Sequence, residues 1–84
     1  MQYPYKKYGI PEYMWDGLDN YFMNHIKPGS FLMAVLSNDL YNAVIRADQT
    51  NRELLNNYAL MLINEAPTNS YGSYENVNNW LSTR

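Results

Sequence analysis

Apolar residues recur with a helical period along the central stretch of the chain, residues 28–48. Their spacing follows the 3.6-residue repeat of an α-helix and matches no strand period. Ser30 follows Pro28 and Gly29 and is a candidate N-cap residue. The pattern predicts one helix from Phe31 to Ala47, with a long buried stripe that consists of Leu32, Val35, Leu36, Leu40, Ala43, Val44 and Ala47.

The segment before this stretch predicts another helix, which begins at Pro11. Proline is preorganised for the first helical position, and Pro28 disfavours helical geometry at the residue that precedes it. The first helix should therefore end by Ile26 or Lys27. Its expected buried stripe consists of Met14, Leu18, Tyr21, Phe22, His25 and Ile26.

Two further helices follow the central stretch. One should run from Asn51 to Glu65 or Ala66, before Pro67, and Thr50 with Glu53 matches a capping box. Residues 58–63, YALMLI, are apolar nearly all round, which predicts either a position inside the core or a half-exposed interface. A short last helix, residues 74–82, should be capped by Ser73 and needs Trp80 to dock on the body.

Residues 1–9 contain three tyrosines, a proline and a glycine, and they predict an extended N-terminal arm. We expect part of this arm to pack onto the body, with contact to a partner as the alternative. The predicted fold is therefore all-α. It is a compact bundle of three main helices plus a short C-terminal helix, in a single domain of residues 10–84, preceded by the Tyr-rich arm.

Composition narrows the range of functions. The chain has 84 residues, a net charge of −2 and no cysteine, which excludes disulfides and thiolate metal sites. The charge has the wrong sign for a protein held on nucleic acid mainly by phosphate contacts. No apolar run approaches the membrane-spanning length of about 20 residues, and the N-terminus lacks the apolar part of a secretory signal. We therefore expect a cytoplasmic protein.

Candidate catalytic residues are few. His25 is the only histidine, and no neighbour in sequence supplies a nucleophile or a carboxylate to orient it, although Asp39 could approach it in space. We interpret His25 as a core or turn-capping residue. For Asp39 the alternatives are an acid in a pocket, a solvated edge position, or a pair with Arg46, Arg52 or a backbone amide. We expect no enzyme, no cofactor and no metal site, because no phosphate-binding, hydrolase or zinc motif is present.

Two further features of the sequence allow a binding role as well as a purely structural one. Glu12, Asp16 and Asp19 recur on one face of the first helix, which is either solvated or open to a basic partner. A tight polar turn before Asn51 allows a helix-turn-helix interpretation. In that case Asn51, Arg52, Asn56 and Asn57 would face base edges. The strongly apolar character of that helix argues against DNA binding.

The pattern IPEYMWDGLDNYF…PGSFLMAVLSNDLYNAVIRAD…NEAP…YGS…V…W resembles a group of small, largely uncharacterised proteins encoded in bacteriophages and prophages. The resemblance covers about residues 10–81 and is densest in residues 28–48. It implies a phage accessory protein, which would act in the host cytosol, and no specific activity. Asn38 and Asp39 are difficult to assign to packing alone, so they are the first candidates for a recognition surface.

The leading hypothesis is a non-enzymatic accessory protein that binds a host or phage protein, as an inhibitor or modulator of a host factor such as a defence system. The many tyrosines suit a contact surface. The alternatives are a self-associating, virion-related structural protein and a helix-turn-helix-like DNA-binding regulator. The predicted partner-binding residues are Tyr3, Tyr5, Lys6, Lys7 and Tyr8 of the arm, and Asn38, Asp39, Asn42 and Arg46 of the central helix.

Overall fold

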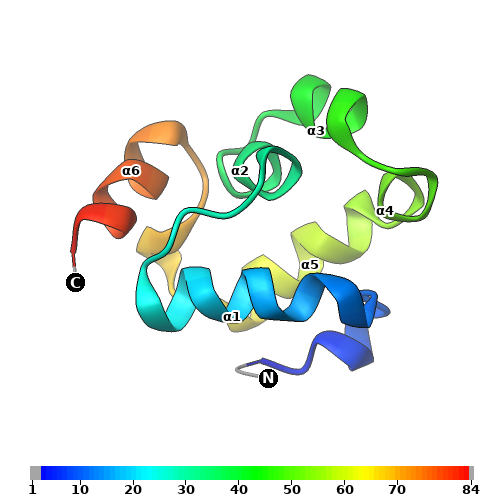
Figure 1. The fold of residues 1–84 in the computed structure, drawn as a ribbon, viewed down its shortest axis with the longest axis horizontal. Helices are drawn as coiled ribbons and strands as arrows, with labels where there is room; N and C mark the ends of the chain where they lie inside the picture. Colours follow the sequence, from blue (N-terminus) through cyan, green and yellow to red (C-terminus); the bar gives the residue numbers. More distant parts are fainter. Residues whose placement is uncertain (1–2, 84) are drawn as a thin grey trace.

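The computed structural model describes residues 3–83, and over this range the chain is helical without a strand (Figure 1). The all-α prediction is therefore confirmed at the level of fold class. The α-helices are α1 (Trp15–Asn24), α2 (Ser30–Leu36), α3 (Leu40–Arg46), α4 (Gln49–Glu53), α5 (Leu55–Glu65) and α6 (Tyr74–Ser82). Short 3-10 turns cover Tyr5–Tyr8, Glu12–Met14 and Thr68–Ser70.

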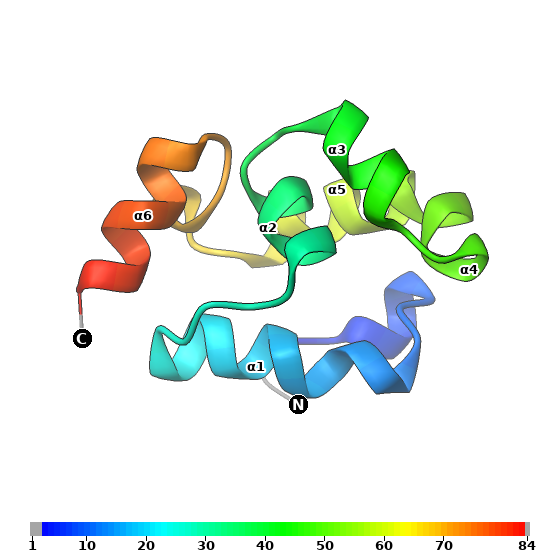
Figure 2. The same ribbon diagram turned by 45° about the horizontal axis from the view of Figure 1, so that its top comes forward.

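Helix α2 occupies the centre of the molecule. Figures 1 and 2 show α1 along one side of it, α3 and α4 toward one end of the molecule, and α6 toward the other. Four of its residues are buried, namely Phe31, Leu32, Ala34 and Leu36. Such a short helix is marginal alone, so α2 depends on the neighbours that cover it.

Three tyrosines lie fully buried in the core, and each hydroxyl has a hydrogen-bond acceptor. Tyr5 donates to Oδ1 of Asp19 at 2.7 Å, and Tyr21 donates to the carbonyl oxygen of Ser70 at 2.6 Å. Tyr58 donates to Oδ1 of Asn51 at 2.7 Å. A buried hydroxyl without a partner would destabilise the fold, so these bonds fix which segments surround each ring.

The predicted continuous helix over residues 31–47 is wrong, because the chain reverses at Asn38 and Asp39. Asn38 has φ +60°, the left-handed conformation that asparagine tolerates better than most residues. The amides of Asn38 and Asp39 donate back to the carbonyls of Val35 and Ala34, the hydrogen-bond pattern of a Schellman motif. Local backbone hydrogen bonds therefore end α2, although the helical spacing of apolar residues continues past Asn38 and Asp39.

Asp39 then begins α3 as its N-cap, and its carboxylate accepts from the amide of Asn42. After this reversal α3 buries Ala43 and turns Leu40 outward, so that Leu40 is 62% exposed. The predicted core stripe is consequently wrong at Leu40. The predicted N-cap of the central helix is also wrong, because Gly29 occupies that position and Ser30 is the first helical residue.

The next predicted helix, over residues 51–65, is divided into α4 and α5 at Leu54. The capping box of Thr50 and Glu53 is wrong, because Thr50 lies inside α4 and Asp48 is the N-cap. Oδ1 of Asp48 accepts from the amide of Asn51 at 2.7 Å. The expected end before Pro67 is confirmed at Glu65.

The start and end of the first helix also differ from the prediction. A 3-10 turn over Glu12–Met14 precedes α1, so α-helical structure begins later than Pro11. At the other end, His25 adopts φ +55° and terminates the helix. Its Nδ1 donates to the carbonyl of Trp80 at 2.5 Å, which agrees with the turn-capping interpretation.

The N-terminal arm is not extended over its described residues, 3–9. Tyr5–Tyr8 form a 3-10 turn that ends at Gly9, whose φ is +74°. Tyr5 is buried, and the ring of Tyr3 packs edge-on against Phe22 at 5.0 Å. The expectation that part of the arm packs onto the body is confirmed, whereas its first two residues lie outside the described residues.

The last helix agrees with the prediction. Ser73 caps α6 by accepting from the amide of Asn76 at 3.0 Å. Trp80 docks the helix: its Nε1 donates to the carbonyl of Tyr21 at 2.9 Å, and its ring stacks on His25 at 4.5 Å.

Raising the pH should unfold the protein through its buried tyrosines. Burial raises the pKa of Tyr5, Tyr21 and Tyr58 above the usual value of about 10. Because the folded-state pKa lies above the unfolded one, their contribution to stability is complete below about pH 10 and is lost as the pH rises further. Phenolate absorbance, followed together with circular dichroism, should show exposed tyrosines ionising first and buried ones only as helicity disappears. Ionisation of all tyrosines with helicity intact would contradict this.

The Asp48→Ala variant should have a lower Tm than wild type, because it removes the cap of α4 and the acceptor of the Tyr13 hydroxyl. Asp48→Asn should retain most of the stability, since asparagine also caps helices. The matched Thr50→Ala variant should change Tm little, because Thr50 caps no helix. Thermal denaturation measures the Tm of all three variants. A larger decrease in Tm for Thr50→Ala than for Asp48→Ala would support the capping box instead.

Candidate functional site

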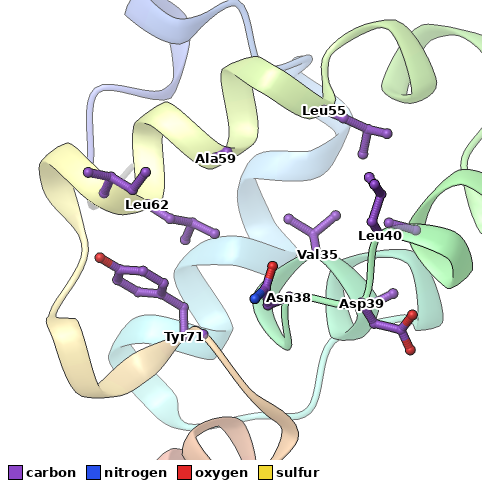
Figure 3. A pocket seen from close by; sticks show the side chains of 12 residues that line it. Val35, Asn38, Asp39, Leu40, Leu55, Ala59, Leu62 and Tyr71 are labelled. Atoms are coloured by element: carbon purple, nitrogen blue, oxygen red, sulfur yellow. The ribbon is translucent and has the colours of Figure 1, made fainter.

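An open apolar groove of about 300 Å³ lies among α2, α3 and α5 (Figure 3). Aliphatic or aromatic side chains form most of its wall, and the loop before α6 closes one end. The lining residues are Ala34, Val35, Asn38, Asp39, Leu40, Ala43, Leu55, Ala59, Leu62, Ile63, Tyr71 and Gly72. We refer to this feature as the groove.

The reversal at Asn38 creates the groove. It folds α3 back along α2, and the small residues Ala34 and Ala43 allow these two helices to approach closely. Ala59 contributes only a methyl group from α5, which leaves space between the helices. The amide of Gly72 donates to the carbonyl of Leu36 at 2.7 Å, and this bond holds the Tyr71–Gly72 segment at the end of α2.

Large apolar side chains form the rims. Leu40 on α3 is 62% exposed and Ile63 on α5 is 64% exposed. Tyr41 and Ile45 extend the apolar surface along α3, with exposures of 82% and 73%. Figure 3 shows Leu40 and Leu55 pointing toward one another across the groove. Contiguous exposed apolar residues of this kind mark contact surfaces more often than isolated ones do.

The predicted contact residues of the central stretch are divided between two places. Asn38 and Asp39 line the groove, whereas Asn42 and Arg46 line a second, separate depression. Figure 3 shows the carboxylate of Asp39 pointing away from the apolar side chains. Asp39 is therefore at the edge of the groove and not a polar group within it.

Asp39 has a structural role that the sequence did not reveal. Its Oδ2 accepts from the hydroxyl of Tyr74 at 2.5 Å and from Nδ2 of Asn42 at 2.7 Å. The bond from Tyr74, followed by those from Asn42, holds the pKa of the Asp39 carboxyl below its usual value. The carboxylate thus links α3 to the start of α6. Of the expected alternatives, the edge position and the pairing with a backbone amide are observed, and Arg46 adds an attraction.

The predicted contact residues of the arm do not line the groove. Tyr5 is buried and its ring is not available to a partner. The hydroxyl of Tyr8 donates to Oε2 of Glu65 at 2.7 Å, which ties the arm to the end of α5. Lys6 and Lys7 are exposed, and Tyr3 is half-buried. The two predicted sets of contact residues therefore do not form one site.

The residues on which the DNA-binding alternative depends are engaged within the fold. Asn51 is buried and bonds to Asp48 and Tyr58. The guanidinium of Arg52 donates to the carbonyls of Val44 and Ala47, at 3.2 and 3.1 Å. Nδ2 of Asn57 donates to the carbonyl of Tyr8 at 2.9 Å. Among the four predicted base-reading residues, Asn56 alone is exposed without such a bond in the described structure.

Over residues 3–83, no three side chains among histidines, aspartates and glutamates gather closely enough to hold a metal ion. None of the helices described is long and apolar enough to cross a membrane. The ionisable groups that line the groove are the Asp39 carboxylate, at its edge, and the phenol of Tyr71. Its wall is suited to binding apolar groups and offers no paired acid and base.

The groove was not predicted, because Leu40 was assigned to the core and Tyr71 was not singled out, although residues 58–63, which include Ala59 and Ile63, were one expected interface. Two signals were present in the sequence. Asn38 and Asp39 interrupt the apolar stripe with the residue types that end and begin helices. The YALMLI segment has more apolar faces than a single core contact can cover, and Ile63 is its exposed member at the groove.

No family model, curated protein or solved structure matches this chain. The resemblance to phage-encoded proteins thus stays a prediction.

Replacing Tyr74 by phenylalanine should raise the pKa of Asp39 toward its usual value of about 3.9, because the hydroxyl is the main cause of its depression. A carboxyl ¹³C titration by NMR measures this change. Tyr13→Phe is a matched control, since the Tyr13 hydroxyl donates to Asp48 and not to Asp39. This control should raise the pKa of Asp48 and leave that of Asp39 unaltered. If the pKa of Asp39 is the same in Tyr74→Phe as in wild type, the hydrogen bond from Tyr74 to Asp39 does not form in solution.

Proposed function

We propose that this chain is a small binding protein that accepts an apolar segment of another protein in the groove. The observation that carries the proposal is the pair of exposed aliphatic side chains, Leu40 on α3 and Ile63 on α5, that line the same apolar depression. Burial of such side chains by a partner removes apolar surface from water, which favours association. Their exposure in the isolated chain has no stabilising role within the fold.

The shape of the site favours an amphipathic helix as the bound segment. In this mode a helix lays one apolar face into a groove, with anchor residues spaced three or four positions apart. The rims come from two helices, α3 and α5, so a third helix between them would complete a packed layer. A flat, extensive homodimer interface would need about 800 Å² on each partner, whereas a groove of this size suits one short segment.

The biological setting of the proposal comes from the sequence resemblance alone. In that setting the chain is a non-enzymatic phage accessory protein in the host cytosol. Its partner is a host or phage protein, and binding inhibits or modulates a host factor such as a defence system. Recognition by an apolar groove suits this role, because it requires neither a cofactor nor a catalytic group.

Self-association is the second candidate, and the exposure of Tyr41 and Ile45 favours it. These residues continue the apolar surface beyond the groove along α3, where a second copy could cover them. A structural, virion-related role would use such contacts. Light scattering separates the candidates, because only self-association makes the measured mass rise with protein concentration.

A photo-crosslinking residue at position 41 should capture the partner in cells that contain it, because Tyr41 is exposed and directly follows Leu40, which lines the groove. The same residue placed at position 13 is the control, since Tyr13 is also exposed but lies outside the groove. Leu40→Ser and Ile63→Ser should each weaken the captured complex about 30-fold, since loss of an interface anchor costs about 2 kcal/mol. Binding of the identified partner is measured by calorimetry.

Met23→Ser provides a matched control for these substitutions. Met23 is 58% exposed, similar to Leu40 and Ile63, but it lies on α1 and does not line the groove. The Met23→Ser variant should leave the affinity for the partner unchanged. All three variants should keep the wild-type Tm within a few degrees. Equal loss of affinity in Met23→Ser, or none in the two groove variants, would contradict the proposal.

A further inference from the structure

A second depression, of about 380 Å³, lies between the connection that precedes α2 and the outer side of α3. We refer to it as the hollow. Its lining residues are Lys27, Pro28, Ser30, Met33, Ala34, Asn42, Arg46 and Tyr74. It shares only Ala34 with the groove, so it is a distinct feature of the same two helices.

Two cationic side chains from separate segments border the hollow. Lys27 lies in the connection between α1 and α2, and Arg46 is the last residue of α3. Neither forms a close ion pair with any residue between positions 3 and 83, although Arg46 attracts the carboxylate of Asp39. The other described cations are placed differently: Arg52 donates to backbone carbonyls, and Lys6 and Lys7 lie on the arm. Two like charges that face one depression repel each other, and a bound anion would relieve this repulsion.

The nearest acid limits the charge that this anion can carry. Asp39 receives hydrogen bonds from Tyr74 and Asn42, which both line the hollow, and Arg46 attracts its carboxylate. The hollow therefore combines two positive charges with one negative charge at its edge. A monoanion balances this set, whereas a phosphate dianion would meet repulsion from Asp39.

The remaining donors suit a carboxylate. The guanidinium of Arg46 can bind both oxygens of a carboxylate through parallel N–H donors, and Lys27 supplies a point charge. The hydroxyl of Ser30 forms no hydrogen bond within the described chain and is a further donor. The hydroxyl of Tyr74 and the amide of Asn42 are already used by Asp39. Met33 and Ala34 provide an apolar wall for a short aliphatic stem.

We propose that the hollow is a binding site for one carboxylate group on a short aliphatic stem, held by Arg46 and Lys27. The carboxylate can belong to a free small acid or to an acidic side chain of a polypeptide. Both sources share the same recognition, which is a single negative charge between the two cations and a stem against Met33. This site is independent of the groove, so the proposal for the hollow does not require that an apolar segment binds in the groove.

NMR titration of the ¹⁵N-labelled full chain tests the site with three probes, at ionic strength held constant by sodium chloride. The probes are butyrate, N-acetylglutamate N-methylamide and inorganic phosphate. Butyrate should produce saturable shifts at the Arg46 Nε–H and at the amides of Ser30 and Asn42, with an affinity in the millimolar range. Tighter saturation by the glutamate derivative than by butyrate assigns the site to a protein-borne acid, and tighter saturation by butyrate assigns it to a free acid.

Arg46→Gln and Lys27→Gln should each weaken butyrate binding at least fivefold. Both residues are exposed, so the variants should fold, which their circular dichroism and Tm verify. Lys6→Gln is the matched control, because Lys6 is an exposed cation outside the hollow, and it should bind butyrate as wild type does. Shifts that rise linearly without saturation, unaltered binding in Arg46→Gln and Lys27→Gln, or tighter binding of phosphate than of butyrate would each overturn the proposal.

Discussion

The reversal at Asn38 and Asp39 determines which apolar side chains of the central stretch are buried. A Schellman motif closes α2, and the carboxylate of Asp39 caps α3 two residues after Ser37. These local hydrogen bonds satisfy backbone groups that an uninterrupted helix would have satisfied internally, so the break costs little free energy. Once α3 is turned back on α2, Ala43 and Ala47 face inward and Leu40 faces solvent. The groove is the direct result.

Buried tyrosines add directional hydrogen bonds to the apolar core of this small protein. Each of Tyr5, Tyr21 and Tyr58 joins two different segments through a hydroxyl that must find its acceptor. Tyr5 connects the arm to α1, Tyr21 connects α1 to the loop before α6, and Tyr58 connects α5 to α4. A chain of this length buries a modest share of its surface, so directional bonds add to the selection of one arrangement.

The groove and the hollow present different chemistry on the same pair of helices. The groove is apolar with one carboxylate at its edge, and the hollow is cationic with a limited apolar wall. Asp39 links the two features, because the hydroxyl of Tyr74 and Nδ2 of Asn42, which border the hollow, donate to its carboxylate while its backbone shapes the groove. A binding protein with both features can select a partner by shape and by charge, although each feature is argued from separate residues.

The sequence alone determined the all-helical class, the end of α5 before Pro67 and the bounds of α6. These follow from short-range physics: proline cannot continue a helix, and Ser73 caps the next one. Apolar periodicity also identified much of the core, including Leu18, Phe22 and Leu36. The tertiary structure decided where helices break and therefore what remains exposed. Leu40 fits a core stripe by its spacing, but spacing assumes an unbroken axis, and the bonds at Asn38 and Asp39 change that axis. Whether Tyr5 is buried or free likewise depended on a partner distant in sequence, namely Asp19.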